Sequence, residues 1–244
     1  MRDTRQTNST LRGARALIIG VGGLGAPAAR VLAGAGVGVL GLVDPDRVEV
    51  SNLHRQPLYR EDDVGRPKAV AAAERLRAAH PGLAVQAVEE RFVPALGPLL
   101  DDFDVVLDGT DSIAAKFLIN DATVARGVPL VHAGAVGTRA QLLTVLPGHS
   151  ACYRCLFEDP PPPDEVPSCH EAGVLGPSVV LAGTLQAAEA LRLLAGDAPL
   201  FAGHLLHVDT RLGAWRRVVV TPRPACPACG PLHRNVPTQR SIAR

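Results

Sequence analysis

The chain has 244 residues, of which 47% are hydrophobic and 20% are charged, and its formal net charge at pH 7 is +1. This length and apolar content suffice for one α/β domain with a sizeable core. The near-neutral charge excludes a strongly basic nucleic-acid or membrane-surface footprint, and no apolar run approaches the roughly 20 residues of a membrane span. The N-terminal segment lacks the apolar core of a signal peptide, so we expect a cytoplasmic protein with reduced cysteines.

Short apolar runs alternate with segments of helical period, a pattern typical of a parallel sheet with crossover helices. The fold expected is therefore α/β and Rossmann-like, with a mostly parallel sheet that is extended by antiparallel strands near the C-terminus. In chain order, strands are expected at 15–21, 37–43, 83–88, 103–107, 129–135, 139–146, 205–208 and 215–220, and helices at 24–35, 68–79, 112–126 and 179–194.

Two segments are expected to be irregular. Four consecutive prolines lie within residues 158–170, so a surface loop is expected at about 157–173. The polar residues 235–244 predict a flexible tail. Residues 1–234 are accordingly expected to form a single domain.

A glycine-rich turn follows the first expected strand and opens a helix. It contains Gly20, Gly22, Gly23 and Gly25, so backbone amides and a helix N-terminus are available to bind a phosphate. Asp44 ends the next strand, where a carboxylate can bind ribose hydroxyls. The glycine pattern alone leaves ATP, NAD and a tight turn without a ligand all open.

Polar and basic residues gather just beyond Asp44. Asn52, Arg55 and Lys68 follow it in sequence, and a nicotinamide enzyme has no obvious use for them there. A triphosphate has such a use, because its charge must be neutralised before an anionic carboxylate can attack the α-phosphorus. This segment therefore favours ATP.

The sequence from Val43 to Ala69, and more broadly from Gly20 to Leu194, resembles the family of MoeB and ThiF, relatives of the ubiquitin-activating enzymes. The resemblance implies that the four glycines cradle ATP and that Asp44 holds its ribose. It implies contacts with the rest of the nucleotide for Asn52, Arg55, Gln56 and Lys68. The loop at about 157–173 would be the crossover loop of a single adenylation domain.

The run Asp108-Gly-Thr-Asp111 matches the family's strand-end motif, whose last aspartate serves Mg²⁺ and catalysis. The family usually has Asn where Ser112 stands, and often Arg where Lys116 keeps the positive charge. From the residues alone, Asp111 has a second interpretation as the N-cap of the following helix.

The N-terminal Arg2-Asp-Thr-Arg5-Gln6 is similar to the family's Arg-Tyr-x-Arg-Gln, in which the second arginine reaches the site of the partner subunit. The resemblance thus implies a homodimer with Arg5 acting in trans. The aromatic residue is absent here and the spacing to Gly20 is short. A disordered basic tail is therefore the alternative.

Two Cys-x-x-Cys pairs are present, Cys152 with Cys155 and Cys226 with Cys229. Four thiolates satisfy a tetrahedral Zn²⁺ and leave no open position, so we expect a structural zinc site that attaches the C-terminal segment. A thiol–disulfide redox pair is the weaker alternative.

Cys169 lies in the proline-rich loop beside His170, which could favour its thiolate. Its position matches a cysteine that some family members use in thioester or disulfide chemistry with the small carrier protein that they activate. A bystander role is equally open from the sequence.

The resemblance implies an adenylyltransferase that uses ATP and Mg²⁺ to activate the C-terminal Gly-Gly carboxylate of a ubiquitin-like sulfur-carrier protein. Pyrophosphate would be released, and a separate sulfur donor would then form the thiocarboxylate. The alternatives are a non-catalytic module that binds a ubiquitin-like protein and, less favoured, an NAD(P)-dependent oxidoreductase. Neither nucleic acid nor membrane is expected as a partner.

Overall fold

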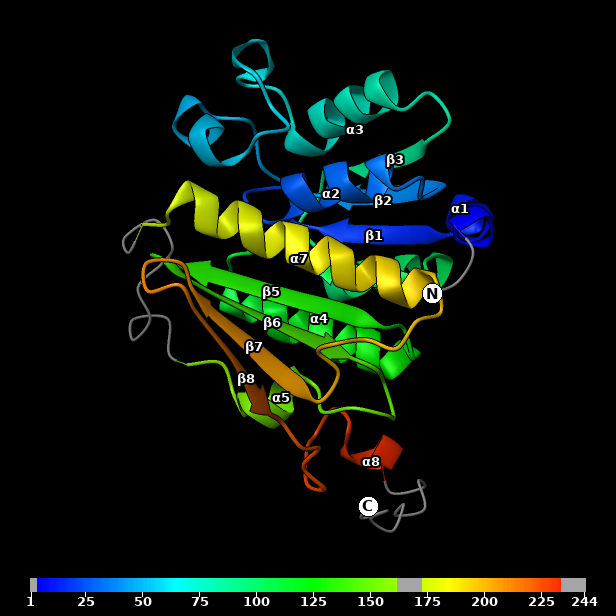
Figure 1. The fold of residues 1–244 in the computed structure, drawn as a ribbon, viewed down its shortest axis with the longest axis vertical. Coiled ribbons are helices and arrows are strands. Elements are labelled where there is room, and N and C mark those ends of the chain that lie inside the picture. The colour runs from blue at the N-terminus through cyan, green and yellow to red at the C-terminus, as the bar shows by residue number, and fades with distance from the viewer. Residues whose placement is uncertain (1–3, 162–172, 234–244) are drawn as a thin grey trace.

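The computed structural model describes residues 4–161 and 173–233, whose strands form an eight-stranded sheet in the order β3-β2-β1-β4-β5-β6-β7-β8 (Figure 1). The first five strands along the chain pair in parallel, and the last three continue the sheet by antiparallel pairing. The strands are β1 (Arg15–Ile19), β2 (Val39–Val43), β3 (Ala84–Val88), β4 (Val105–Asp108), β5 (Leu130–Val136), β6 (Arg139–Val145), β7 (His204–Asp209) and β8 (Ala214–Val219).

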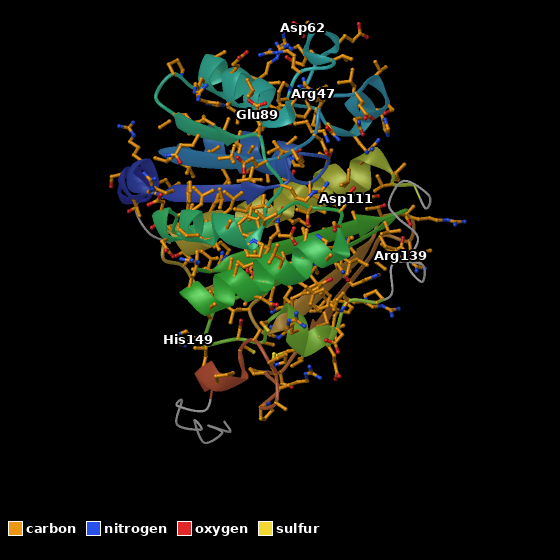
Figure 2. The ribbon with its side chains drawn as sticks, turned by 180° about the vertical axis from the view of Figure 1, so that it is seen from behind. Arg47, Asp62, Glu89, Asp111, Arg139 and His149 are labelled. Atoms are coloured by element: carbon orange, nitrogen blue, oxygen red, sulfur yellow. The ribbon has the colours of Figure 1, made fainter. Side chains whose placement is uncertain are left out.

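Helices cover both faces of this sheet. The α-helices are α1 (Thr4–Gly13), α2 (Gly25–Gly34), α3 (Lys68–Ala79), α4 (Ile113–Arg126), α5 (Tyr153–Leu156), α7 (Gly176–Leu194) and α8 (Gly230–His233), and the 3₁₀ helices are η1 (Val50–Arg55), η2 (Glu61–Asp63) and η3 (Pro94–Asp102). Figure 1 shows α2 and α7 side by side in front of the sheet, and α4 covers the opposite face in the reverse view of Figure 2. None of the helices in 4–161 and 173–233 combines the length and apolarity needed to cross a membrane.

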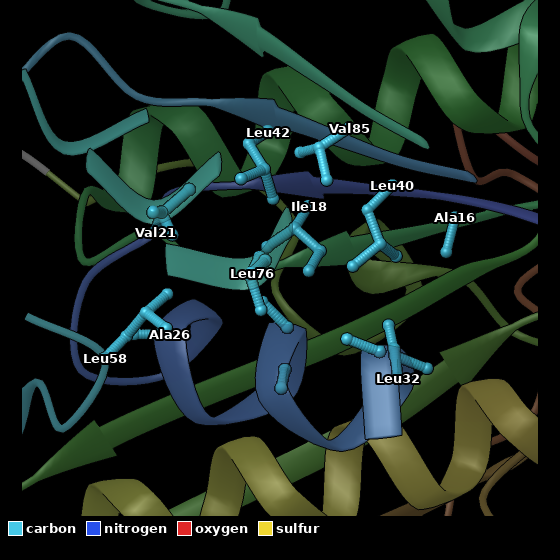
Figure 3. Packing of buried hydrophobic residues seen from close by; sticks show 14 of the residues in the cluster. Ala16, Ile18, Val21, Ala26, Leu32, Leu40, Leu42, Leu58, Leu76 and Val85 are labelled. Carbon is cyan, nitrogen blue, oxygen red and sulfur yellow. The ribbon is translucent and has the colours of Figure 1, made fainter. Parts of the chain in front are cut away.

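The alternation of side chains along β1 explains why both faces are buried. Ile18 packs with Leu32 of α2 and Leu76 of α3 on one face (Figure 3). Leu17 and Ile119 of α4 belong to the hydrophobic cluster on the other face. A strand buried on both sides has a continuous apolar sequence, as the run of β1 does.

The strand order places the ends of three strands around one crevice. β1 lies between β2 and β4, and the register sets Ile19 beside Val43 and Asp108. The chain leaves β1 into the glycine turn and leaves β2 into Asp44. In sheets of this kind, ligands bind outside the carboxyl ends of the strands where the strand order reverses.

The sheet and its helices confirm the expected fold, and the element bounds differ from the expected ones by a few residues. The N-terminal segment departs from the expected structure. Residues 4–13 form the helix α1, so the alternative of a disordered basic tail is wrong for these residues. Leu11 is its buried anchor and joins the cluster beneath α2. A single apolar residue gives no helical period, which is why the sequence pattern missed the helix.

Residues 162–172 of the expected loop and the tail 235–244 lie outside the described residues.

The turn between β1 and α2 requires glycine for reasons of space. A Cβ on Gly25 would lie 1.9 Å from the carbonyl oxygen of Gly20, whose own φ is +86°. Gly34, at the other end of α2, has nothing within 4 Å of its Cβ position.

We therefore expect Gly25→Ala to lower the free energy of unfolding by about 3 kcal/mol or more, since the clash is with backbone that cannot rotate away. Gly34→Ala is the matched control and should be neutral or stabilising by up to about 1 kcal/mol. Urea unfolding measures both. Equal stability of the two variants would contradict this packing.

Candidate functional site

A cavity of about 1400 Å³ lies at the carboxyl ends of the parallel strands. Nearly all the residues that the sequence assigned to a nucleotide line it together: Gly20, Gly22, Gly23, Asp44, Asn52, Arg55, Gln56, Lys68 and Asp111. Gly25 is the exception, because it packs against the backbone of Gly20 and does not face the cavity. The structure shows a packing role for Gly25, and its part in cradling the nucleotide stays a prediction.

Asp44 is tied to the glycine turn. Its Oδ2 accepts a hydrogen bond from the backbone N–H of Val21 at 2.6 Å, and its Oδ1 accepts one from the N–H of Asp46 at 2.9 Å. Burial raises the pKa of Asp44, while the charge of Lys68 acts in the opposite direction. The carboxylate is thus held in one orientation at the mouth of the crevice, where a ribose hydroxyl can donate to it.

Tyr59 is a buried residue that supports the site without lining the cavity, and the sequence reasoning missed it. Its hydroxyl lies 2.7 Å from the carbonyl oxygen of Val21 and 3.3 Å from that of Lys68, so it donates between the glycine turn and the start of α3. Burial, followed by the charge of Asp44, raises the pKa of Tyr59, which keeps the hydroxyl a donor. No spacing rule marks this residue, because its partners are backbone atoms.

Two cations that line the cavity, Arg55 and Lys68, are held by short polar contacts. Arg55 donates from Nη2 to Asn52 Oδ1 at 2.6 Å, and Lys68 Nζ lies 3.0 Å from Asp46 Oδ2. Gln56 is buried beside them, and its Oε1 has no hydrogen-bond partner among the residues that the structure describes. A buried acceptor of this kind calls for a donor, which a bound ligand or water supplies.

Asp111 projects from the end of β4 just before α4 (Figure 2). The residue that caps the helix is Ser112, whose Oγ accepts a hydrogen bond from the N–H of Ala115 at 3.3 Å. The interpretation of Asp111 as the N-cap is therefore wrong. Its exposed carboxylate lines the cavity and has no hydrogen-bond or ion-pair partner among residues 4–161 and 173–233.

A buried charged cluster lies directly beneath this point. Asp108 is fully buried, and its Oδ2 lies 3.2 Å from Lys116 Nζ and 2.8 Å from His132 Nδ1. Burial opposes the charge of Asp108, but Lys116, His132 and Thr110 outweigh it and hold the pKa of Asp108 below its ordinary value. Burial and then Lys116 lower the pKa of His132, so its imidazole is neutral.

His132 is a buried residue of β5. It lies opposite Asp108 in the register of β4 and β5, and this register is what a sequence alone does not supply. Lys116 was expected to carry a charge into the site. It lines the cavity, but its ammonium group also donates to the carbonyl oxygen of Ala133 at 2.7 Å.

The four cysteines come together where α5 meets the C-terminal segment. Their sulfur atoms all lie within 4.8 Å of one another, with Cys152 3.6 Å from Cys226 and Cys155 3.3 Å from Cys229. A tetrahedral ion with metal–sulfur bonds of about 2.3 Å separates its ligands by about 3.8 Å, whereas a disulfide needs about 2.05 Å. Burial raises the pKa of Cys152 to about 11 and also raises the pKa of Cys229, whereas N–H groups of the Cys226–Cys229 turn lower the pKa of Cys226 to about 7 against the effect of burial. The arrangement fits one metal ion.

Two predicted residues are not placed by the structure. Cys169 lies outside the described residues. The backbone of Arg5 belongs to α1, but its side chain is not described. The roles given to both stay predictions.

A model of the ThiF family matches residues 4–228. The chain belongs to the ThiF family. It is 44% identical over 238 residues to a protein of Thermus thermophilus named sulfur carrier protein adenylyltransferase, covering 95% of this chain and 86% of that protein. It is 45% identical over 217 residues to the sulfur carrier protein ThiS adenylyltransferase of Escherichia coli, covering 88% and 85%.

Solved structures show the same fold. The crystal structure of Escherichia coli MccB with ATP superposes with a TM-score of 0.80 at 23% identity, covering 93% of this chain and 69% of that one. The ThiF-family fold therefore accounts for the sheet order and for the crevice in which the cavity lies.

The buried cluster gives a stability prediction for this ThiF-family chain. Asp108→Asn leaves Lys116 charged and buried without its carboxylate, so the free energy of unfolding should fall by about 3 kcal/mol or more. Asp101→Asn is the control, because Asp101 forms an exposed ion pair with Arg126 whose loss costs about 1 kcal/mol at most. Denaturant unfolding at pH 7 measures both variants. An equal fall in the free energy of unfolding would contradict a buried charged cluster around Asp108.

Proposed function

We propose that this protein uses ATP to adenylate the C-terminal carboxylate of a ubiquitin-like sulfur-carrier protein. The observation that carries the proposal is the single cavity that brings the glycine turn, Arg55, Lys68 and Asp111 together. Its volume of about 1400 Å³ exceeds the roughly 300–1,000 Å³ of sites for one small ligand, which leaves room for a peptide tail beside a nucleotide. The names of the two relatives, both adenylyltransferases of sulfur carriers, agree with this activity.

The residues present suit the binding of ATP. Gly22 and Gly23 would present the turn's backbone N–H groups to the phosphates, since the N–H of Gly20 already donates to the carbonyl oxygen of Val43. Asp44 would accept hydrogen bonds from the ribose. Arg55 and Lys68 would contact the phosphates. Their present contacts, Arg55 with Asn52 and Lys68 with Asp46, would then be replaced by phosphate oxygens or kept alongside them. Preorganised cations of this kind stabilise charge where it develops in the transition state.

Asp111 would hold Mg²⁺, since it is an exposed carboxylate in the cavity with no partner among the described residues. When bound, Mg²⁺ supplies neutralisation of the triphosphate charge. The carrier's carboxylate oxygen would attack the α-phosphorus, the bond from that phosphorus to the bridging oxygen would break, and pyrophosphate would leave with the electron pair. The products are the acyl-adenylate and pyrophosphate, and no proton transfer is required.

The proposal includes a homodimer in which Arg5 serves the partner subunit's site, a cytoplasmic location, and a separate protein that donates sulfur to the acyl-adenylate. Cys169 would take part after adenylation, in covalent chemistry with the carrier. Sedimentation of the active protein as a monomer would remove the role of Arg5 in trans.

We expect Asp111→Ala to reduce carrier-dependent ATP–pyrophosphate exchange by at least about 100-fold, because charge neutralisation at the reacting phosphate is lost. The fold should stay intact, since Ser112 and not Asp111 caps α4. Asp102→Ala is the control, being an exposed carboxylate outside the cavity, and should exchange normally. Near-normal exchange by Asp111→Ala would remove it from the reaction. Carrier binding by wild type without any exchange would favour a non-catalytic binding module.

The four cysteines are proposed to hold one structural Zn²⁺. Purified protein should contain one zinc ion per chain by mass spectrometry of metals. Cys229→Ser should lose it and lower the melting temperature, because the ion attaches the C-terminal segment to the rest of the chain. A metal-free native protein whose melting temperature is insensitive to chelators, or one with a disulfide among these cysteines, would contradict the zinc site.

A further inference from the structure

The two residues between Cys152 and Cys155 contact α4 directly. Arg154 makes a forked contact with Asp121, in which Nε lies 2.8 Å from Oδ1 and Nη2 lies 2.8 Å from Oδ2. Its guanidinium group also lies over the ring of Phe117, 4.9 Å from the centroid. A bidentate arginine–carboxylate contact fixes both distance and orientation, which a single charge pair does not.

Tyr153 contacts the same part of α4 from a second direction. Its backbone N–H donates to Oδ1 of the buried Asn120 at 2.8 Å. Its ring meets Phe117 edge to face, with centroids 5.0 Å apart, and lies 4.5 Å from the ring of His132. Tyr153 therefore touches both α4 and the cluster around Asp108.

The C-terminal segment also contacts α5, the short helix to which Tyr153 and Arg154 belong. Arg223 donates from Nη2 to the carbonyl oxygen of Arg154 at 2.9 Å, and its backbone N–H lies 3.4 Å from Cys155 Sγ. The sulfur atoms of Cys226 and Cys229 complete the attachment. The four-cysteine cluster thus anchors α5 (Tyr153–Leu156), and α5 in turn contacts α4.

The N-terminal turns of α4 line the cavity. Asp111 precedes the cap of α4, Lys116 and Phe117 line the cavity from its first turns, and Tyr153 of α5 lines it as well. Asn120 and Asp121 lie only one to two turns further along the helix, at about 1.5 Å of rise per residue. Because a helix moves as a stiff unit, a shift at Asn120 and Asp121 displaces Asp111 and Lys116 as well.

We propose that Tyr153 and Arg154 are positioning residues of the adenylation site, which hold α4 so that Asp111 and Lys116 reach the cavity. The inference rests on the proposed function for its activity readout. It gives the cysteine cluster a role beyond attachment of the C-terminal segment: the cluster sets the geometry of the reacting site through α5.

The test uses Asp121→Ala and Arg154→Ala, alone and combined, in the full-length protein with its native metal content. Asp121→Ala is the sharper variant, because it changes only the α4 side of the contact. Each should keep its metal and reduce kcat of ATP–pyrophosphate exchange about tenfold, with KM for the carrier within about twofold, since misplacement by about 1 Å can cost as much as 100-fold. The double variant should be no worse than Arg154→Ala alone, because Asp121→Ala removes an interaction that Arg154→Ala has already removed.

Arg126→Ala is the matched control. Arg126 also lies on α4 and pairs with an aspartate, Asp101 of η3, at 2.5 Å, but it does not contact α5. This variant should exchange at the wild-type rate. An equal loss of kcat in Arg126→Ala, or an unchanged kcat in Asp121→Ala and Arg154→Ala, would overturn the proposal and leave these residues with a purely structural role.

A spectroscopic readout separates this proposal from the proposed function. The chain has two tyrosines, Tyr59 and Tyr153, so protein labelled with 3-fluorotyrosine gives two ¹⁹F resonances, assigned with Tyr153→Phe. Asp121→Ala should shift the Tyr153 resonance without ligand and leave that of Tyr59 in place, whereas Arg126→Ala should shift neither. An unmoved Tyr153 resonance would overturn the claim that the contact between Arg154 and Asp121 positions α5 against α4. Absence of exchange in wild type, with the resonance shifted, would instead contradict the adenylation activity.

Discussion

The site depends on a contact between backbones at the end of β1. A Cβ on Gly20 would lie 2.8 Å from the carbonyl carbon of Gly109, and a Cβ on Gly109 would lie 2.6 Å from the carbonyl oxygen of Gly20. Gly25 meets the same oxygen from the start of α2. Three glycines therefore let the turn, the helix and the end of β4 meet at one point, which brings the glycine turn next to the segment that carries Asp111.

Charge is divided between two levels of the site. At the lower level, Asp108, Lys116 and His132 are buried and pair with one another, which ties the end of β4 to α4 and β5. At the upper level, Arg55 and Lys68 line the cavity beside Asp111 and Oε1 of Gln56, an acceptor without a hydrogen-bond partner in the described part of the chain. The lower group gives rigidity, and the upper group is available to a ligand.

Much of this arrangement is predictable from the sequence because strand ends in a parallel sheet converge. The glycine turn, Asp44 and Asp111 each follow a recognisable strand, so their meeting at one edge follows from the fold. The two Cys-x-x-Cys pairs are predictable for a similar reason, since four thiolates need one shared partner.

The remainder depends on information that the sequence pattern does not contain. Tyr59 acts on backbone carbonyl oxygens, and His132 reaches Asp108 only through the register of β4 and β5. The choice between Asp111 and Ser112 as the cap of α4 depends on one backbone conformation. The contact between Arg154 and Asp121 joins residues far apart in the chain, which no local periodicity marks.

The central physical claim is that the pocket above the glycine turn is built for a triphosphate. Calorimetric titration of wild type and Lys68→Ala with MgATP and with NAD⁺ tests it most directly. We predict binding of MgATP by wild type, an affinity at least about tenfold lower in Lys68→Ala because a charge-assisted phosphate contact is lost, and no comparable binding of NAD⁺. Preferential binding of NAD⁺ that is indifferent to Lys68 would contradict the account.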